Sequence, residues 1–446
     1  MRLPVLTIRD VAERQLCCGC GACAYISPDD IRMVDDVANG RRPLTRNDDS
    51  PTAREAMAVC PGVRLAHDPA RFPADSIAEL IPGWGPILEV WEGHATDEQI
   101  RYAGSSGGAA SALAMFCIEQ GEMHGLLHID ARPDAPILNH TVLSTSREQI
   151  LRATGSRYAP ASPCDGLGMV EAAPGPCVMI GKPCDIAAAQ KAGELRPSLG
   201  ERLGLTIAIF CAGTPSTQGT MEMLRALGVD DPRQVESVRY RGNGWPGNAT
   251  VTWRDRSGAS RESSLTYAQS WGEILQKHRQ WRCYICPDHT GEFADISVGD
   301  PWYRPIPEGA MGHSLVLVRS ERGRDIVRRA MAAGYLTLER VESRIVPASQ
   351  PNLLSTRGAL WGRRVALRLM GAPVPEFRNM PMFRFWLSEL SLKQKAQSIY
   401  GTIRRVFRKG LRERRPVTPL ATPDESTGAF ESTGCLSPVR AGEEAA

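Results

Sequence analysis

The sequence lacks a hydrophobic run long enough to span a membrane, which takes about 20 consecutive apolar residues. Its first residues (MRLPVLTIRDVAER) include Asp10 and Glu13 and have no apolar core of signal-peptide length. Lysine is scarce, since only 6 of the 53 basic residues are Lys, a bias that we interpret as genomic composition and not as a site. A membrane bundle is therefore excluded, and we expect a cytoplasmic protein.

Composition excludes further classes of protein. Of the 446 residues, 42% are hydrophobic and 23% are charged, as in soluble globular proteins with two or three domains. A collagen-like or wholly disordered chain is excluded. The net charge of +3 is unevenly spread, because residues 361–415 contain 14 Lys and Arg against 3 Asp and Glu, which leaves −8 for the rest. We expect a mildly acidic body and a strongly basic C-terminal part.

Hydrophobic patterning indicates an α/β protein. After an aromatic, Pro- and Gly-rich stretch (IPGWGPILEVWEG), the sequence predicts a helix over 108–120 and a strand, GLLHID. Short buried strands (PCVMIG, LTIAIFC, SLVLVRS) then alternate with helical stretches (TQGTMEMLRALG, RGRDIVRRAMAAG), which favours a mixed sheet. Near the C-terminus, FRFWLSELSLKQKAQSIYGTIRRVFRKGL places apolar residues at helical spacing with Lys and Arg between them.

Four cysteines lie close together in the run CCGCGACAYISP, residues 17–28. Bacterial ferredoxins ligate 4Fe–4S clusters with the spacing C-x2-C-x2-C-x3-C-P, whose fourth cysteine serves a second cluster. Ser27 stands at that fourth position, so we predict one cluster with its last ligand in the Cys-Pro context of AREAMAVCPG. The predicted ligands are Cys17, Cys20, Cys23 and Cys60. Cys18 is expected to face away from them.

Zinc is the main alternative for these thiolates, because four cysteines also suit a tetrahedral zinc site. Zinc sites usually combine two separated Cys-x-x-Cys pairs, whereas three cysteines in one C-x2-C-x2-C run favour a cubane. Reduced thiols without metal are a further alternative. Disulfides are not expected in a cytosolic chain of this length.

A second set of cysteines is dispersed along the chain. It comprises Cys184, Cys211, Cys283 and Cys286. Two of them follow buried strands and two form a Cys-x-x-Cys loop, so they can converge above the edge of a sheet. Taken singly, each is more often a small buried hydrophobe, which is how we interpret Cys117, Cys164 and Cys177.

Read in order, the motifs YAGSSGGAASAL, GSRYAP, VMIGKPCDIAA, IAIFCAGTPS, RYRGNGWPG and CYICPD…GEFADISVGDPW resemble the family of coenzyme F420 hydrogenase/dehydrogenase beta subunits, which includes related chlorophyll(ide) reductases. The resemblance covers roughly residues 10–320. It implies an oxidoreductase with FAD and 4Fe–4S clusters that passes electrons between a reduced deazaflavin, ferredoxin or another carrier and a substrate or partner subunit. It also implies that Cys184, Cys211, Cys283 and Cys286 ligate a core cluster.

We expect a mixed α/β (α+β) fold and divide the chain into five segments, the last two of which lie outside the resemblance. They are a ferredoxin-like iron–sulfur segment (1–75), a flavin-binding first part of the core (76–165), a second part with the second cluster (166–350), a basic helical extension (351–415) and a disordered tail (416–446), in which Cys435 is a bystander. The thin second cysteine run makes a second N-terminal cluster improbable.

A glycine- and serine-rich loop precedes the helix predicted over 108–120. It consists of Gly104, Ser105, Ser106, Gly107 and Gly108, and we assign it to the pyrophosphate or ring edge of FAD. A simple helix cap is the alternative. The loop also fits the nucleophile elbow of hydrolases, but the preceding DEQIRYA is polar and helix-like instead of a buried strand.

Other candidate cofactor contacts follow from the same motifs. They are Arg157, Tyr158, Lys182, Arg241, Gly242, Gly244 and Trp245. Arg157 suits a phosphate, Tyr158 could stack on a ring, and Lys182 could stabilise reduced flavin electrostatically. The RYRGNGWPG residues could shape an electron-donor pocket or form a rigid turn. Asp295 and Asp300 could bind a ligand or orient the Cys283–Cys286 loop.

Several features stay open. We assign no role to His278, His289 or His313, and we name no catalytic residue or proton donor. The basic region 361–415 could be a packed amphipathic helix with a solvated face, a peripheral membrane contact or a partner-subunit contact. No nucleic-acid module appears. Alternatives to a self-sufficient oxidoreductase are an electron-transfer subunit of a larger complex, a zinc-stabilised binding protein, and a redox core redeployed in a biosynthetic setting.

Overall fold

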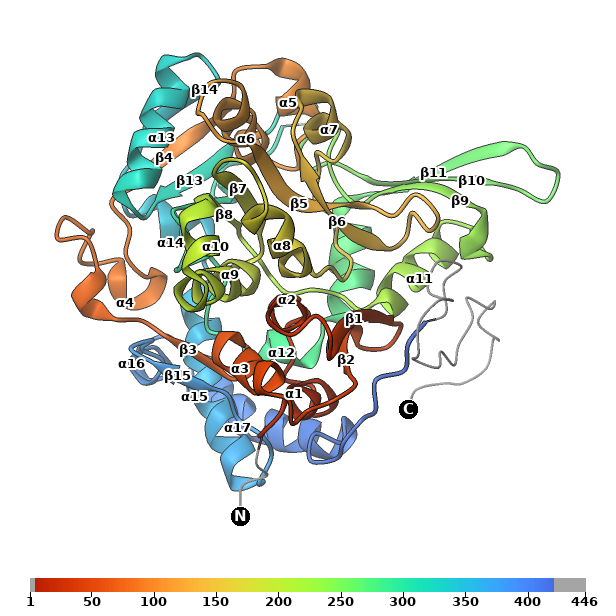
Figure 1. Ribbon diagram of the computed structural model, residues 1–446, viewed down its shortest axis with the longest axis vertical. Helices are drawn as coiled ribbons and strands as arrows, with labels where there is room; N and C mark the ends of the chain where they lie inside the picture. The colour runs from red at the N-terminus through yellow and green to blue at the C-terminus, as the bar shows by residue number, and fades with distance from the viewer. Residues whose placement is uncertain (1–4, 308, 421–446) are drawn as a thin grey trace.

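An eight-stranded mixed sheet forms the centre of the protein, whose computed structural model describes residues 5–307 and 309–420 (Figure 1). In spatial order the strands are β14 (Leu336–Arg340), β4 (Glu89–Ala95), β13 (Ser314–Val318), β12 (Ile296–Gly299), β8 (Leu203–Ile209), β7 (Cys177–Gly181), β5 (Gly125–Ala131) and β6 (Asn139–Ser144). Strands β12, β8, β7 and β5 are parallel neighbours, and the outer strands pair antiparallel. The predicted mixed α/β fold is confirmed.

The middle strands are apolar because both of their faces are covered. All five residues of β13 (SLVLV) are buried, and in the β7–β8 pair Val178 lies opposite Leu205. Parallel strands buried on both faces are near-continuous runs of Val, Ile and Leu for this reason. The predicted strands GLLHID, PCVMIG, LTIAIFC and SLVLVRS are confirmed as β5, β7, β8 and β13.

Helices cover the two faces of the sheet with separate hydrophobic cores. On one face lie α6 (Ala109–Glu119) and α13 (Glu321–Ala332), packed on residues such as Ile207 and Val316. On the other, α9 (Pro183–Leu195) shares a core with helices of the N-terminal segment. The helix predicted over 108–120 is α6, and the two later predicted helical stretches are α11 (Thr217–Ala226) and α13.

The N-terminal segment is a small layer packed on α9. It consists of α1 (Ile8–Glu13), α2 (Ala22–Ile26), the hairpin β1 (Ile31–Asp36) and β2 (Gly40–Thr45), and α3 (Pro51–Val59). The cysteine-rich loop joins α1 to α2, and Cys60 caps the C-terminal end of α3. Gly21 has φ +92° and begins α2, where a Cβ would lie 2.6 Å from the Asp165 backbone nitrogen, so the loop is packed tightly on the core.

Smaller elements surround the sheet. A three-stranded sheet of β9 (Val235–Arg239), β10 (Ala249–Arg254) and β11 (Ser260–Leu265) projects from the body (Figure 1). The short helices are α4 (Ile81–Trp84), α5 (Glu98–Ala103), α7 (Arg147–Arg152), α8 (Leu167–Glu171), α10 (Pro197–Arg202), α12 (Trp281–Tyr284), α14 (Ile345–Ser349), η1 (Pro69–Arg71), η2 (Pro163–Gly166), η3 (Pro232–Gln234), η4 (Ala268–Ile274) and η5 (Leu275–His278).

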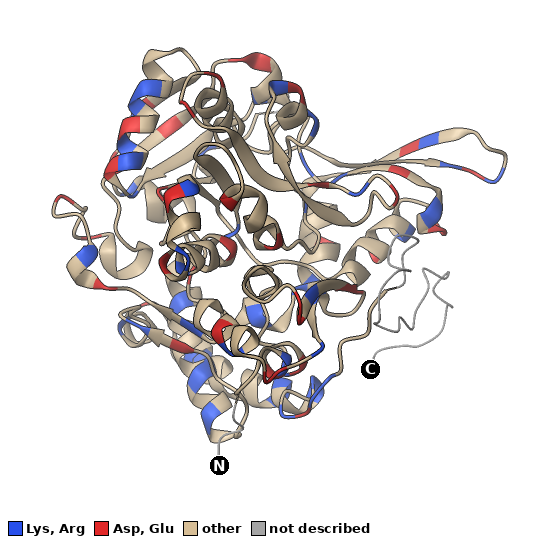
Figure 2. Ribbon diagram, viewed as in Figure 1, with Lys and Arg blue, Asp and Glu red and all other residues tan. Residues whose placement is uncertain are grey.

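The C-terminal extension is helical and lies beside the N-terminal segment. It contains α15 (Leu353–Leu369), β15 (Glu376–Arg378), α16 (Phe383–Ser388) and α17 (Leu392–Arg408), and β15 pairs with β3 (Arg64–Ala66). Lys and Arg are frequent on these helices (Figure 2). The helical spacing predicted for this region is confirmed. Leu420 is buried and its N–H donates to the Asp35 carbonyl at 2.7 Å, so the body extends to this point.

The five segment boundaries stay predictions. Strands from both sides of residue 165 share the central sheet. The predicted disordered tail, with Cys435, falls largely on residues 421–446, outside the described residues.

No helix within 5–307 and 309–420 has the length and apolar character needed to cross a membrane.

Candidate functional site

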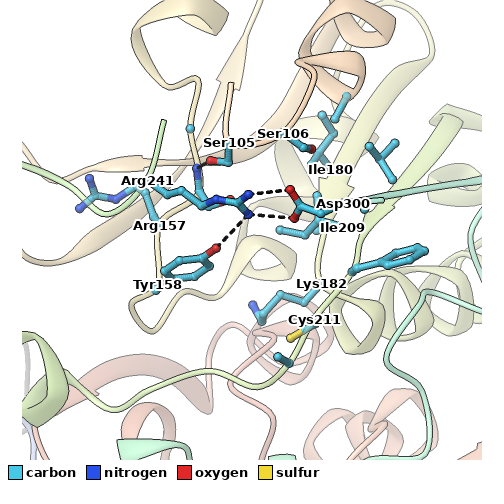
Figure 3. A pocket seen from close by; sticks show the side chains of 18 of the residues that line it. Ser105, Ser106, Arg157, Tyr158, Ile180, Lys182, Ile209, Cys211, Arg241 and Asp300 are labelled. Carbon is cyan, nitrogen blue, oxygen red and sulfur yellow. Dashed lines mark hydrogen bonds and ion pairs between the residues drawn. The ribbon is translucent and has the colours of Figure 1, made fainter. Parts of the chain in front are cut away.

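A cavity of about 630 Å³ lies at the carboxyl ends of the parallel strands β7, β8 and β12 (Figure 3). Its wall includes Ile180 in β7, Ile209 at the end of β8 and Asp300 directly after β12. Open α/β sheets bind ligands at this edge, where strand ends and the following loops converge. The volume is typical of cofactor sites, which measure about 300–1,000 Å³.

The Gly104–Gly108 loop lies on the cavity wall between α5 and α6. Gly104, Ser105, Ser106 and Gly108 line the cavity. Gly108 caps α6 with φ +74°, and Ser105 Oγ accepts a hydrogen bond from the Ser156 N–H at 2.5 Å. Gly107 lies elsewhere, because its N–H donates to Ser314 Oγ at 2.9 Å and a Cβ would lie 2.8 Å from the Gly93 carbonyl oxygen. The predicted loop therefore reaches the cavity through four of its five residues.

Arg157 lines the same cavity, but its guanidinium is engaged by the protein. Its Nη1 donates to the Val238 carbonyl at 3.0 Å, its Nη2 to the Pro136 carbonyl at 2.7 Å, and its Nε to Asn139 Oδ1. Burial lowers the pKa of Arg157. These contacts give it a structural task, and its phosphate contact stays a prediction.

The buried Arg241 forms an ion pair with the partly exposed Asp300 in the cavity wall (Figure 3). Arg241 Nη1 lies 2.8 Å from Asp300 Oδ2, Nη2 lies 2.5 Å from Oδ1, and Trp245 Nε1 donates to Oδ1 at 2.8 Å. Burial opposes the charged guanidinium, but the Asp300 carboxylate outweighs it and raises the pKa of Arg241. The guanidinium also lies over the rings of Tyr267 and Trp302, 4.9 and 5.2 Å from their centroids.

Other residues of the RYRGNGWPG motif support this pair instead of lining the cavity. Gly242 packs on the backbone, since a Cβ there would lie 2.6 Å from the Ala103 carbonyl oxygen. Trp245 is 6% exposed and stacks on Trp302 with centroids 5.9 Å apart. Asp295, at the other end of β12, accepts hydrogen bonds from Thr206 and acts within the sheet.

Lys182 brings a positive charge to the cavity beside two cysteines. It follows β7 and its Nζ lies 2.6 Å from Asp185 Oδ2 at the start of α9. Burial opposes the ammonium, yet Asp185 and the neighbouring thiols of Cys184 and Cys211 raise the pKa of Lys182. The group therefore stays protonated at neutral pH.

Aromatic residues and the start of the C-terminal extension also line the cavity, and sequence reasoning missed them. They are Tyr267, Trp271, Trp302, Gln350, Asn352, Leu353 and Thr356. Trp271 lies 4.8 Å from the Tyr158 ring, centroid to centroid. His289, to which no role was assigned, lines the cavity and its Nδ1 contacts the Cys211 carbonyl at 2.9 Å. Nothing in the local sequence pattern marks these positions, which meet only through tertiary contacts.

The four N-terminal cysteines meet at one small cavity. It is lined by Cys17, Cys20, Cys23 and Cys60, together with their neighbour Cys18. Cys17 Sγ accepts a hydrogen bond from the Gly19 N–H at 3.2 Å, and burial raises the pKa of this thiol to about 11. Burial raises the pKa of Cys60 further, with Cys20 and Cys17 adding to it.

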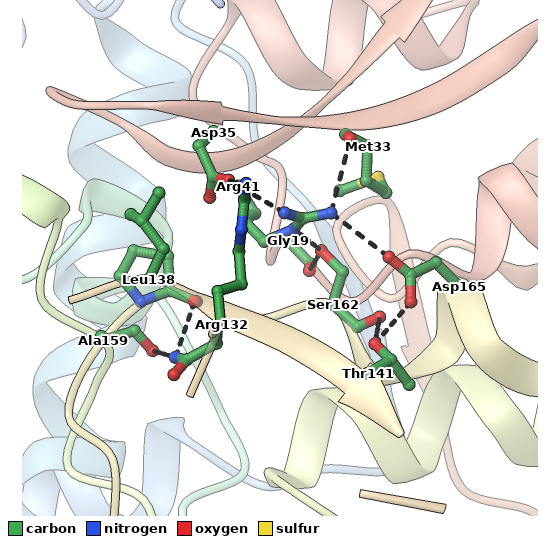
Figure 4. A network of polar contacts seen from close by, with 12 residues as sticks. Gly19, Met33, Asp35, Arg41, Arg132, Leu138, Thr141, Ala159, Ser162 and Asp165 are labelled. Atoms are coloured by element: carbon green, nitrogen blue, oxygen red, sulfur yellow. Dashed lines mark hydrogen bonds and ion pairs between the residues drawn. The ribbon is translucent and has the colours of Figure 1, made fainter. Parts of the chain in front are cut away.

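A polar network holds this cysteine loop on the core (Figure 4). Ser162 Oγ donates to the Gly19 carbonyl at 2.7 Å, and Arg41 bridges Asp35 of β1 and Asp165 of the core at 3.0 and 3.3 Å. The Cys164 N–H donates to the Cys20 carbonyl at 2.8 Å. The loop geometry thus depends on residues more than 100 positions away.

The dispersed cysteines also come together, on the side of the sheet edge that faces the N-terminal segment. Cys184 lies at the start of α9, and Cys283 and Cys286 flank the end of α12. The Thr214 N–H donates to Cys283 Sγ at 3.3 Å, and Cys211, after β8, has Cys283 as a neighbour. As interpreted, Cys117, Cys164 and Cys177 are buried, each 0% exposed.

The donor sets fit iron–sulfur clusters in their chemistry. Deprotonating several neighbouring buried thiols is unfavourable unless cations join them, and burial raises the pKa of Cys17, Cys23 and Cys60. N–H groups donate to sulfur in both sets, as they do around ligated clusters. Among the residues described, no group of three or more His, Cys, Asp or Glu side chains is arranged to hold a single metal ion.

Comparison with known families finds two matches that together cover more than half of the chain. Residues 90–167 match the model for the N-terminal part of the coenzyme F420 hydrogenase/dehydrogenase beta subunit, and residues 176–344 match the model for its C-terminal part. The N-terminal cysteine segment and the C-terminal extension lie outside both matches.

Curated proteins and solved structures give similar matches at low identity. The beta subunit of coenzyme F420 hydrogenase from Methanosarcina barkeri is 23% identical over 58% of this chain and 84% of its own length. The beta subunit of F420-dependent formate dehydrogenase 1 from Methanococcus maripaludis is 24% identical over 56% and 60%. The beta subunit of coenzyme F420 hydrogenase from Methanococcus voltae is 23% identical over 56% and 82%. A chain of the F420-reducing [NiFe] hydrogenase complex from Methanosarcina barkeri matches in fold with a TM-score of 0.50 and 21% identity, over 64% of this chain and 94% of that one.

Proposed function

Because the chain belongs to the family of coenzyme F420 hydrogenase/dehydrogenase beta subunits, we propose that it is an iron–sulfur flavoprotein oxidoreductase that relays electrons between 4Fe–4S clusters and FAD. In this role it reduces or oxidises a small molecule or an electron carrier. One observation carries the proposal: Lys182 and Cys211 line the large cavity, and Cys184 lies two residues beyond Lys182, so a ligand in the cavity would lie beside cysteine thiols.

FAD would occupy the large cavity. The N-terminus of α6, with Ser105 and Ser106, offers hydrogen-bond donors to the pyrophosphate, and Trp271 and Tyr158 offer rings against which a flat group can pack. The protonated Lys182 would stabilise negative charge on a reduced ring. When bound, FAD supplies two-electron hydride chemistry and the clusters supply single-electron transfer.

Two cysteine sets would hold two clusters. Cys17, Cys20, Cys23 and Cys60 would ligate the N-terminal cluster in a ferredoxin-like segment, and the dispersed cysteines would ligate the core cluster. Zinc in the N-terminal set is the alternative. The run of three cysteines at ferredoxin spacing supports iron.

A protein partner is part of the proposal. The relatives are named as subunits of hydrogenases and dehydrogenases, so this chain would exchange electrons with a partner subunit, ferredoxin or a reduced deazaflavin. A candidate contact surface lies within 361–415, where exposed Leu392, Tyr400 and Phe407 stand on α17 with exposed Lys393 and Arg404. Apolar and basic side chains on one helix also suit an anionic membrane surface.

The test is an ultraviolet–visible spectrum of anaerobically purified protein, with iron, zinc and flavin measured on the same sample. Two clusters and one flavin predict about eight irons and about one FAD per chain. Stoichiometric zinc without flavin would contradict the proposal and leave a binding or structural role.

A further inference from the structure

Three arginines from separate segments surround one tyrosine, Tyr284, beside the large cavity. The guanidinium groups of Arg279 and Arg405 lie over the Tyr284 ring, 4.9 and 5.7 Å from its centroid. Arg363 Nη1 donates to the Tyr284 carbonyl at 2.5 Å. Arg279 follows η5, Arg363 lies on α15 and Arg405 lies on α17, so the fold brings three positive charges together from distant positions in the chain. We call Arg279, Arg363 and Arg405 the arginine cluster.

Arg279 joins the arginine cluster to the large cavity, whose wall it helps to form. Its backbone pairs with Pro215 in an antiparallel bridge. Its Nε donates to the Gln276 carbonyl at 3.1 Å and its Nη1 to the Ala212 carbonyl at 3.0 Å. Among the residues that the structure describes, Nη2 has no protein partner. The guanidinium is therefore fixed in position and keeps N–H donors for a ligand.

The charge of the arginine cluster is not balanced by carboxylates. Two other cations of the cavity wall, Lys182 and Arg241, each pair with a carboxylate, at 2.6 and 2.8 Å. No Asp or Glu within residues 5–307 and 309–420 forms an ion pair with the arginine cluster. Helices α15 and α17 contain no acidic residue, and Lys and Arg are frequent on them (Figure 2). This region therefore keeps a net positive charge.

The charges of the arginine cluster also act on one another. Burial, with the neighbouring charges of Arg405 and Arg279, lowers the pKa of Arg363 to about 10, so its guanidinium stays protonated at neutral pH. All three residues are partly exposed, so an ion can reach them from solvent. Cations that gather without a carboxylate repel one another, and an anion among them offsets this repulsion. The arrangement therefore favours a negatively charged ligand.

We propose that Arg279, Arg363 and Arg405 form an anion-binding site at the edge of the large cavity, which takes a phosphate or carboxylate group of a ligand. The guanidinium fork suits both groups, because its N–H donors match two oxygens at once. Thr356 lines the cavity, and Arg363 stands about two turns further along α15, about 10 Å along the helix axis. A ligand in the cavity can therefore extend an anionic end to the arginine cluster.

This site goes beyond the proposed function, because anion binding by the arginine cluster needs neither flavin nor iron. Two of its three residues, Arg363 and Arg405, belong to the C-terminal extension, which lies outside both family matches. The extension therefore has a binding task of its own beside the cavity.

Anion binding by the purified full-length protein tests the proposal. Isothermal titration calorimetry at low salt measures the dissociation constants of inorganic pyrophosphate and of citrate, which probe the phosphate and the carboxylate chemistry. We expect the wild type to bind at least one of these probes, and Arg405→Gln and Arg279→Gln each to raise its dissociation constant about tenfold. Arg404→Gln, which replaces the exposed neighbour of Arg405 on α17, is the matched control and should bind as the wild type does. Arg405→Lys, which keeps the charge, should bind more tightly than Arg405→Gln.

A repeat in the presence of FAD identifies the source of the anionic group. If FAD competes with the binding that Arg405→Gln weakens, the arginine cluster takes the pyrophosphate of FAD. If that binding is unchanged by FAD, the anionic group belongs to a second ligand. Both results support the site.

Three results would overturn the site. They are a wild type that binds neither probe at low salt, equal affinity in the wild type and Arg405→Gln, and a changed reduction potential in Arg405→Gln with unchanged anion affinity. The last result would assign the arginine cluster to the neighbouring Cys283 and Cys286. Arg405 is the deciding position, because its side chain donates no hydrogen bond to the described residues and its replacement removes none from the fold. Each of these results leaves the proposed function standing, whereas a wild type that binds pyrophosphate but contains neither iron nor flavin would contradict the proposed function alone.

Discussion

The two cysteine groups of this protein are built in opposite ways. The N-terminal group takes three of its thiols from seven consecutive residues, 17–23. The fourth comes from Cys60, at the C-terminal end of α3. The predicted core group takes its thiols from the start of α9, the segment after β8 and the loop of α12, which are distant in the sequence. Three thiols of the first group are already close in the sequence, whereas the thiols of the second group come together only in the folded chain.

The two cysteine groups differ in how their thiols are brought together. Three of the N-terminal thiols lie close together in the sequence and long-range contacts hold their loop on the core, whereas the thiols of the core group come from three elements that are distant in the sequence. The network of Arg41, Ser162 and Asp165 ties the two together, so the N-terminal loop is positioned by the same core that builds the second group (Figure 4).

The largest expected effect comes from removing one ligand from each group. If the two groups hold separate clusters, as proposed, Cys60→Ala and Cys184→Ala should each lose about four of about eight irons, and the double variant should lose nearly all of them. Iron analysis and electron paramagnetic resonance of the reduced proteins check this. Complete iron loss in either single variant would contradict the claim that the two cysteine groups are separate sites.

The next effect concerns the cavity wall beside the core group. Arg241→Ala should lower the free energy of unfolding by about 3 kcal/mol and reduce flavin content, because it leaves the Asp300 carboxylate, whose side chain is 13% exposed, without its ionic partner. Chemical denaturation and flavin absorbance measure both. Arg261→Ala, which removes the exposed partner of Asp255 on β11, is the matched control and should leave the denaturation midpoint unchanged. If Arg241→Ala and Arg261→Ala had the same denaturation midpoint and the same flavin content, the structural role of the Arg241–Asp300 pair would be contradicted.

A smaller effect is expected from His128, which lines the cavity from β5. Burial lowers its pKa from 6.5 to about 4, and its Nε2 lies 2.8 Å from Ser144 Oγ. The folded protein keeps this ring neutral below pH 6.5 while the unfolded chain takes up a proton, so the free energy of unfolding falls as the pH drops from 6.5 toward 4.

Replacement of that ring tests the pH dependence. Between pH 6.5 and pH 4, the free energy of unfolding should fall less in His128→Gln than in the wild type. The difference between the two falls should reach up to about 3 kcal/mol at pH 4. His124→Gln, just before the same strand, is the control. Denaturation curves at several pH values give the answer, and parallel pH profiles for wild type and His128→Gln would contradict it.

The smallest effect concerns the basic helix α17, on the side of the N-terminal group. If this face binds an anionic membrane surface, the double variant Tyr400→Ser/Phe407→Ser should cosediment several-fold less with phosphatidylserine vesicles, and high salt should weaken wild-type binding. Met169→Ser, an exposed apolar residue on α8, serves as the control. If the wild type does not bind the vesicles at low salt, this face of α17 does not bind membranes, and it either contacts a protein partner or is exposed to solvent.

Much of the fold was predictable because its signals are local. The strands GLLHID, PCVMIG, LTIAIFC and SLVLVRS are apolar runs bounded by turn residues, and the helix after Gly108 begins where Gly and Ser give way to Ala and Leu. The order of the eight strands was not predictable in the same way. It depends on crossovers such as the one that brings β4 between β13 and β14.

The residues of the candidate site are likewise of two kinds, those that the local sequence predicts and those that only tertiary contacts bring together. Spacing grouped Cys17, Cys20 and Cys23, and the Cys-Pro context added Cys60, and the structure brings all four to one small cavity. The Gly–Ser loop was predicted from its composition before a helix. Spacing could not identify the pairing of Arg241 with Asp300 or the arrival of Gln350 and Asn352 at the cavity, because each joins residues that only the sheet and the C-terminal helices bring together. The internal contacts of Arg157 were likewise invisible, since its motif suggests only a free guanidinium.

The most direct test of the account is anomalous X-ray diffraction at the iron edge from crystals of anaerobically purified protein. We predict two iron-cluster peaks, one among Cys17, Cys20, Cys23 and Cys60 and the other among Cys184, Cys211, Cys283 and Cys286, with flavin density in the cavity beside Lys182. A signal at the zinc edge in place of iron, or a cavity that stays free of flavin in protein reconstituted with FAD, would contradict it.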